Sequence, residues 1–164
     1  MILYHGSDGP IDGVIVPDYI IPSDGFYMYT RREDCVMHVA NRDWPCCVTL
    51  GFDLSEVPEE RIVRLSVMDK VMYGLLSKQI ASELYKDKSV IIGPYIPVHL
   101  MRKLMDGIKD GSLTYDMIQG MMEQLDLGEE YIVKDKDLCS KIEVIQTTEL
   151  TSDGIDEAGK YVML

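Results

Sequence analysis

The sequence predicts a single α+β domain, in which a split or mixed antiparallel sheet carries a cleft and helices surround it. Its 164 residues are enough for one domain and too few for two of ordinary size. Short apolar or aromatic runs that end in Gly, Pro or Asp are typical of strands. Between these runs, apolar residues recur three and four positions apart, which is the pattern of an amphipathic helix.

The N-terminal part is predicted to consist of strands and loops. Residues 2–4 form a short apolar strand. The segment 8–25 is rich in Gly, Pro and Asp and contains apolar pieces at 14–16 and 19–21, so we expect loops with short strands there. Residues 25–29 are aromatic and favour another strand.

A helix is predicted over 31–42. Thr30 and Glu33 have the spacing of a capping box, in which the Thr hydroxyl caps a backbone N–H and the Glu side chain bonds back. The apolar residues of this helix fall on one face: Cys35, Val36, Val39 and Ala40. Strands are expected next at 46–52 and 61–65.

The longest helical pattern runs over 67–86. Ser66 and Asp69 resemble a capping box at its start. Its apolar residues recur at helical spacing: Val67, Met68, Val71, Met72, Leu75, Leu76, Ile80 and Leu84. A short buried strand at 90–92 follows, and it is closed by Gly93 and Pro94.

Two more helices are predicted at 97–108 and at 115–126, the second capped by Thr114. Their methionines fill the gaps of a core between helices. Residues 130–133 are predicted to form a strand, whereas the pattern of 137–145 assigns no element.

The folded domain is therefore expected to span 1–146. Residues 147–164 are predicted to be an acidic tail, of which 161–164 is apolar enough to dock as an edge strand.

Charge and hydropathy argue against general nucleic-acid binding and against a membrane-spanning protein. The net charge is −12 and the pI is about 4.5, so general nucleic-acid binding, which needs clustered Lys and Arg, is not expected. The acidic surface favours a basic partner. No apolar run is long enough to cross a membrane, and the N-terminus lacks the pattern of a signal peptide, so we expect a cytoplasmic protein.

The four cysteines, Cys35, Cys46, Cys47 and Cys139, include no C-x-x-C pair. We interpret them as reduced thiols of a cytosolic protein. A zinc site built from Cys46, Cys47 and His38 lacks the usual ligand spacing, so no metal is expected.

Two stretches carry the functional hypothesis. Leu-Tyr-His-Gly-Ser at 3–7 places His5 at the end of a predicted strand, directly before a glycine that lets a ligand approach the main chain. Gly-Phe-Tyr-Met-Tyr-Thr at 25–30 places Tyr27 in the next strand. Together they resemble the ADP-ribosyltransferase fold of the histidine–tyrosine–glutamate type, which diphtheria-toxin-like and poly-ADP-ribose enzymes use.

Further segments narrow the resemblance. With VMHVANR at 36–42, VTLGFD at 48–53 and VIIGPY at 90–95, the order of motifs over residues 2–145 is similar to that of a bacterial family called DUF3990, a divergent branch of this fold. The chain departs from that family in two places. It has Pro-Ser-Asp-Gly at 22–25 where the family has Asp-Phe-Gly-x-Gly, and Glu-Glu-Tyr at 129–131 where the family often has Gln before an aromatic residue.

The resemblance implies an enzyme that uses NAD as co-substrate and transfers ADP-ribose to an unknown macromolecular acceptor, or hydrolyses NAD. It implies that His5 bonds the adenosine-side ribose, that Gly6 meets the nicotinamide carboxamide through its backbone with help from Ser7, and that Tyr27 packs on the nicotinamide ring. Gly25 belongs to the same binding motif.

The third member of the site must be an acid, because a carboxylate stabilises the oxocarbenium-like transition state. Glu130 is our choice, and Glu129 and Glu143 remain open. Residues 129 and 130 cannot both face the cleft in a regular strand. The alternative is a binding module that keeps the fold without catalysis and holds a nucleotide or a protein partner. An antitoxin is one such partner that related families suggest.

Overall fold

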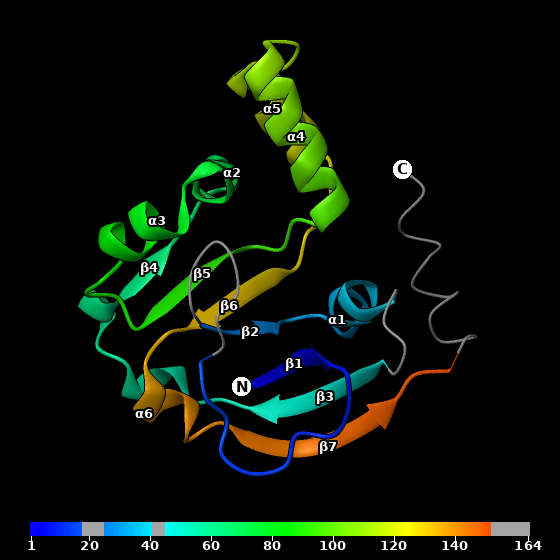
Figure 1. Cartoon of the computed structure of the whole chain (residues 1–164), viewed down its shortest axis with the longest axis vertical. Helices are drawn as coiled ribbons and strands as arrows, with labels where there is room; N and C mark the ends of the chain where they lie inside the picture. Colours follow the sequence, from blue (N-terminus) through cyan, green and yellow to red (C-terminus); the bar gives the residue numbers. More distant parts are fainter. Residues whose placement is uncertain (18–24, 41–44, 152–164) are drawn as a thin grey trace.

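Seven strands form one mixed sheet in the order β4-β5-β6-β2-β1-β3-β7 (Figure 1). The structure is a computed structural model that describes residues 1–17, 25–40 and 45–151. Every neighbouring pair of strands is antiparallel except β4 and β5, which run parallel. The predicted α+β class is confirmed, and six α-helices accompany the sheet in the described part of the chain.

The strands are β1 (Ile2–Ser7), β2 (Phe26–Tyr29), β3 (Cys46–Gly51), β4 (Ile62–Arg64), β5 (Val90–Pro94), β6 (Glu129–Val133) and β7 (Glu143–Glu149). The helices are α1 (Arg32–Val39), α2 (Val67–Leu75), α3 (Lys78–Leu84), α4 (Val98–Asp110), α5 (Tyr115–Met122) and α6 (Lys136–Cys139). Two 3₁₀ turns, η1 (Leu54–Glu56) and η2 (Glu59–Arg61), connect β3 to β4.

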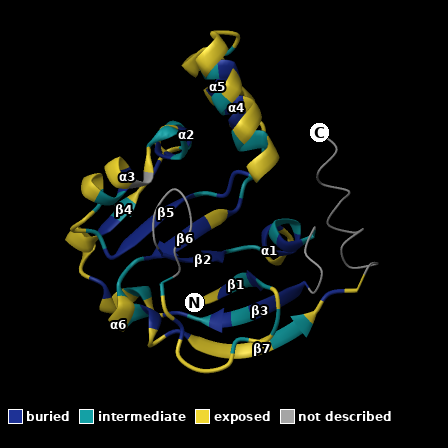
Figure 2. Cartoon of the chain, in the orientation of Figure 1, coloured by how far each residue is buried: buried dark blue, intermediate teal, exposed yellow. Residues whose placement is uncertain are grey.

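Side-chain alternation divides the sheet into two buried faces. In β2, Phe26 and Met28 join the larger core, which α6 and Ile15 of the N-terminal coil complete. Tyr27 and Tyr29 point to the opposite face, where α1, α2 and α3 pack. Figure 2 shows that β2, β5 and most of β6 are buried, whereas much of β7 is exposed.

Helices α4 and α5 project away from the sheet and have a core of their own (Figure 1). Leu104 of α4 and Ile118 of α5 pack with Val71 of α2, and all three are almost fully buried. Gly111 ends α4 with a positive φ of 77°, a conformation that glycine adopts without steric cost. The sheet and this helical unit therefore meet along α2 and the start of α4.

The sheet has a weak junction between β1 and β2. These strands share one registered pair, Tyr4 with Tyr29, whereas β1 and β3 are paired along the whole of β1. The side chain of His5 lies at this junction, where its Nδ1 contacts the Tyr27 carbonyl oxygen of β2.

The helix predicted over 67–86 is wrong as a single element. It divides into α2 and α3 because Leu76 is extended, with ψ of 146°, and Ser77 caps a new helix by accepting from the N–H of Ile80. The capping box of Ser66 and Asp69 is confirmed at the start of α2.

The capping box predicted for Thr30 and Glu33 is also wrong. Arg31 is the N-cap of α1, and no side chain caps it. The Thr30 hydroxyl instead accepts from the N–H of Glu129 at 2.9 Å and lies 3.3 Å from the Glu129 carbonyl oxygen. Thr30 therefore contacts strand β6 instead of capping helix α1.

The chain forms no strand at 14–16; Ile11 and Ile15 pack against the core as coil. The unassigned segment 137–145 contains the end of α6 and the start of β7. Strand β7 continues to Glu149, past the domain boundary at 146 that the sequence predicts, and the N–H of Leu150 donates to the carbonyl oxygen of Pro45.

The predicted strands at 19–21 and 161–164 lie outside the described residues. No helix in the described ranges is long and apolar enough to cross a membrane.

Candidate functional site

A cavity of about 540 Å³ lies where the sheet meets the helical unit. Strands β1, β2 and β6 supply one wall, and helices α2 and α4 supply the other. His38 of α1, Asp8 after β1, and Tyr95 and Ile96 after β5 also line it. The cavity therefore lies over the end of the weak junction between β1 and β2.

Five of the six residues predicted for the site line this cavity: His5, Gly6, Ser7, Tyr27 and Glu130. They come from three strands, β1, β2 and β6. The sixth, Gly25, does not line it. A side chain at Gly25 would meet Ile132, Val133 and Lys134 at the far end of β6, so this glycine allows strand packing and not ligand access.

The orientation of His5 is determined by two contacts with β2. Its Nδ1 lies 2.7 Å from the carbonyl oxygen of Tyr27, so Nδ1 carries the proton and donates. Its ring stacks on Phe26 with 4.3 Å between ring centroids. The His5 side chain thus connects β1 to β2, which share one registered backbone pair. The other ring nitrogen, Nε2, belongs to the same cavity-lining side chain.

Gly6 has a structural role beside its place in the cavity wall. A Cβ here would collide with Val39 Cγ1 and would lie 3.3 Å from the carbonyl oxygen of Cys35. Both contacts belong to α1, so the missing side chain lets this helix lie close against β1. The hydroxyl of neighbouring Ser7 lies 3.4 Å from the N–H of Gly9.

Aromatic rings form much of the cavity wall. Tyr27 and Tyr29 come from β2, and Tyr95 packs edge-on against Tyr29 at 4.9 Å between centroids. Burial, reinforced by the nearby Glu130 carboxylate, raises the pKa of Tyr29 well above its ordinary value, and burial also raises the pKa of Tyr95. Both phenols therefore stay neutral and offer flat faces to a planar ring.

Glu130 projects from β6 into the cavity and forms a buried ion pair with Lys70 of α2. Each residue is 7% exposed, so the two charges compensate one another out of bulk water. Lys70 Nζ also lies 5.7 Å from the centroid of the Tyr73 ring, within the range of a cation–π contact.

Gly93 of β5 lies next to this ion pair, directly opposite Glu130 in the β5–β6 register. A Cβ at Gly93 would lie 3.2 Å from Leu65 Cβ, which is a tight contact, and 3.6 Å from Lys70 Cδ, which is an ordinary van der Waals distance. The missing side chain therefore eases the packing of Leu65 against β5, and the lysine stem passes close to the same position.

The two other candidate acids lie elsewhere. Glu129 is exposed, does not line the cavity, and bonds Thr30 through its backbone. Glu143 begins β7 at the edge of the sheet, and it lines a different hollow. Of the three candidates, Glu130 is the one that shares the cavity with His5 and Tyr27.

Four charged or imidazole side chains of the cavity were not among the predicted site residues: Asp8, His38, Lys70 and Arg102. Lys70 had a signal, because a lysine within the apolar face that contains Val67 and Val71 requires a buried partner. Arg102 looks like an ordinary charge on α4, and Asp8 like an ordinary loop acid. The ring of His38 lies 5.6 Å from that of Tyr29, centroid to centroid.

Close to the cavity, Asp34 of α1 is a buried carboxylate whose Oδ2 has no hydrogen-bond partner among the residues that the structure describes. A Cβ at Gly128 would collide with this oxygen, so the glycine just before β6 accommodates it. Burial raises the pKa of Asp34 to about 6; Arg31 opposes this rise, and Glu33 and more distant acids add to it.

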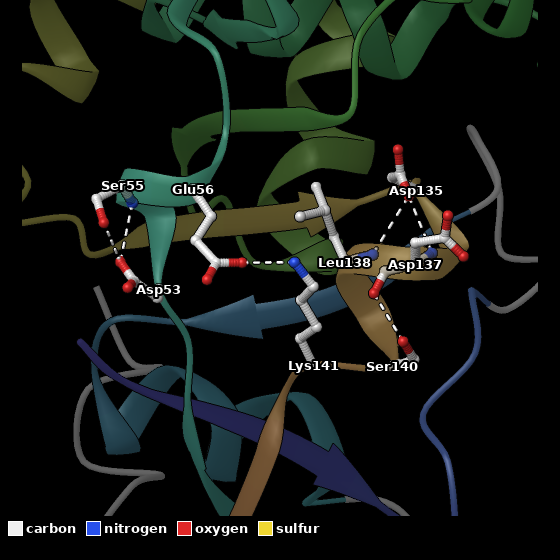
Figure 3. Close-up of polar contacts among 8 residues, drawn as sticks. All are labelled: Asp53, Ser55, Glu56, Asp135, Asp137, Leu138, Ser140 and Lys141. Carbon is white, nitrogen blue, oxygen red and sulfur yellow. Dashed lines mark hydrogen bonds and ion pairs between the residues drawn. The ribbon is translucent and has the colours of Figure 1, made fainter.

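A larger hollow of about 940 Å³ lies beside β7, near η1 and α6. Near this hollow, polar side chains form hydrogen bonds and ion pairs within the chain (Figure 3). Asp53 caps η1 through Ser55, and Lys141 pairs with Glu56 at 2.6 Å. These charged side chains near the hollow therefore stabilise the local fold. The smaller cavity is the better candidate for a ligand-binding site.

All four cysteines are free and buried, and the thiol of Cys35 donates to Cys47 Sγ at 3.0 Å. Within the described ranges, no three His, Cys, Asp or Glu side chains are placed to hold a metal ion.

Comparisons with protein-family models, with curated proteins and with solved structures find no match to this chain.

Proposed function

We propose that this chain is an ADP-ribosyltransferase-like enzyme of the histidine–tyrosine–glutamate type, which binds NAD in the 540 Å³ cavity and breaks its nicotinamide–ribose bond. ADP-ribose then passes to a macromolecular acceptor or to water. The split sheet, the NAD site and the DUF3990 relationship are parts of this one proposal.

The proposal rests on one observation: residues that lie far apart in the sequence line the same cavity. The sequence motifs predict His5, Tyr27 and Glu130 as site residues, and these three line one cavity together with Gly6 and Ser7. A cavity lined by aromatic faces with a few convergent polar groups is the usual form of a small-molecule site. The cavity is also large enough for a cofactor, since such sites range from about 300 to 1,000 Å³.

In the proposed reaction the C1′–N bond of NAD breaks, and nicotinamide leaves with the bonding electron pair. Positive charge develops on the ribose, and the Glu130 carboxylate stabilises it at short range. Tyr27 packs on the nicotinamide ring, and the Gly6 backbone orients its carboxamide. The acceptor oxygen or nitrogen then bonds C1′ and releases its proton to solvent.

The ion pair with Lys70 must be compatible with this chemistry. Lys70 Nζ engages Glu130 Oε2, and the second oxygen, Oε1, is the acceptor that the proposal assigns to the ribose 2′-hydroxyl. A carboxylate accepts several hydrogen bonds at once, so the lysine orients Glu130 without occupying it completely.

The same ion pair favours a second candidate function. If Lys70 cancels the charge of Glu130, the chain is a nucleotide-binding module without catalysis. Such a module binds NAD and releases no nicotinamide.

Thermal unfolding with NAD tests the shared part of both candidates. Millimolar NAD is expected to raise the melting temperature, because a ligand that binds only the folded state stabilises it. Tyr27→Leu should abolish this shift, since it removes the ring that packs on nicotinamide. Tyr115→Leu is the matched control, because Tyr115 is exposed on α5 and does not line the cavity. The absence of any NAD-dependent shift in the native chain would contradict the proposal.

A further inference from the structure

The inner face of helix α4 forms the outer wall of the cavity. Val98, Met101, Arg102 and Met105 all line it, and their spacing of three and four places them along one side of the helix. Leu104, on a different side of α4, packs in the helical core. Met101 belongs to both surfaces, because it also packs against the helical core that contains Leu104.

The two basic side chains of the cavity, Lys70 and Arg102, differ in whether they have an ionic partner. Lys70 is buried and paired with Glu130. Arg102 is exposed, and within the described ranges it forms no hydrogen bond or ion pair. The guanidinium of Arg102 is thus an unneutralised cation on a cavity wall that also contains the acids Asp8 and Glu130.

This cation matters because the chain as a whole repels anions. The net charge is −12, so a ligand that carries phosphate groups approaches against the overall field unless a local cation attracts it. Arginine suits that task, since its planar fork of donors binds two phosphate oxygens at once and keeps its charge at all working pH values.

We infer that Arg102 is the diphosphate anchor of the cavity and gives it a preference for dinucleotides over ligands that lack a diphosphate. The inference rests on the proposed function: with nicotinamide near Tyr27 and Glu130, the diphosphate lies further along the same ligand, towards α4. Val98, Met101 and Met105 then supply an adaptable apolar surface beside it.

Calorimetric titration with three probes tests this role: ADP-ribose, NAD and nicotinamide alone. Arg102→Gln should weaken ADP-ribose and NAD about tenfold to hundredfold, because it removes a charge-assisted pair of hydrogen bonds. It should leave nicotinamide binding unchanged. Arg102→Lys should recover part of the affinity, since the charge returns without the bidentate fork.

Lys103→Gln is the matched control. Lys103 is exposed on the same helix, one residue along, and does not line the cavity. An equal loss in Lys103→Gln and Arg102→Gln would show general charge attraction and would overturn the inference. So would unchanged ADP-ribose affinity in Arg102→Gln. If the native chain bound neither NAD nor ADP-ribose, the proposed function would fail with it, so the two failures are distinguishable.

Discussion

Lys70 and Glu130 lie 60 residues apart in the sequence and form an ion pair that is almost fully removed from solvent at the wall of the cavity. Lys70 comes from α2 and Glu130 from β6, so the pair also joins a helix to the sheet. The lysine stem passes Gly93 of β5 at van der Waals distance. Residues from α2, β5 and β6 therefore meet at this contact.

Removing the lysine alone should be costly. Lys70→Met leaves a buried carboxylate without its partner, which typically lowers the free energy of unfolding by about 3–5 kcal/mol. The double variant Lys70→Met with Glu130→Leu should lose less than the sum of the two single variants, since no charge then remains buried. Urea denaturation of the four proteins measures this coupling. A loss below about 1 kcal/mol in Lys70→Met, the range of exposed ion pairs, would contradict a buried pair.

His5 should contribute to stability through its bond across the junction of β1 and β2. His5→Ala removes the donor to the Tyr27 carbonyl and the stacking on Phe26, at a cost of about 1–3 kcal/mol. His5→Asn places an amide donor near the Nδ1 position and should be closer to the native stability. Both variants lack Nε2, so both should weaken NAD binding. If Asn were as destabilising as Ala, the hydrogen bond would not be the stabilising contact.

Gly6 should tolerate no side chain. Gly6→Ala drives a methyl group into Val39 and towards the Cys35 carbonyl, and overpacking of this kind costs about 1–3 kcal/mol. Gly9→Ala is the matched control, because nothing lies within 4 Å of a Cβ there. Thermal unfolding of both variants should separate them clearly. Equal melting temperatures would mean that α1 does not lie against β1 as the structure places it.

Asp34 should make the folded state less stable as the pH rises. Its pKa is about 6 in the folded chain against 3.8 as the ordinary value, because burial disfavours the carboxylate. The folded state therefore holds this proton more tightly, and stability is lost between about pH 4 and pH 6. Asp34→Asn removes that loss and, because solvent screens part of the effect, should be more stable than the native chain by about 2 kcal/mol above pH 7.

Denaturation of both proteins at several pH values measures this effect. The difference between Asp34→Asn and the native chain should shrink towards zero as the pH falls to about 4. A constant difference at all pH values would show that Asp34 is not the group that titrates.

The sequence predicts much of the fold because hydrophobic periodicity is local. The strands and helices at 90–92, 97–108 and 130–133 appear with shifted ends. Errors arose where a distant contact competed with a local one. Thr30 has the spacing of a helix cap, yet its hydroxyl bonds Glu129 on a strand 99 residues away. The break at Ser77 shows the reverse case, in which a local cap interrupts a continuous apolar pattern.

The sequence also predicts part of the candidate site, namely the residues that belong to local motifs. His5 and Tyr27 belong to compact motifs. Strand alternation predicts that Glu129 and Glu130 face opposite sides, and in the structure Glu129 is exposed and Glu130 is buried. Gly25 shares its motif with Tyr27 but lies away from the cavity, which no spacing reveals. Arg102 is visible as a cavity residue only after α4 is placed beside the sheet.

Release of nicotinamide from NAD is the measurement that tests the central claim most directly, with the native chain compared with Glu130→Gln and Glu129→Gln. In Glu130→Gln the new amide oxygen can still accept from Lys70, so the variant should fold, and unfolding curves check this. The native chain and Glu129→Gln should release nicotinamide, and Glu130→Gln should be slower by at least about a hundredfold, since a charge that stabilises the transition state is lost. Equal release by all three proteins would contradict the assignment of Glu130. NAD binding without release by the native chain would replace the enzyme by the binding module.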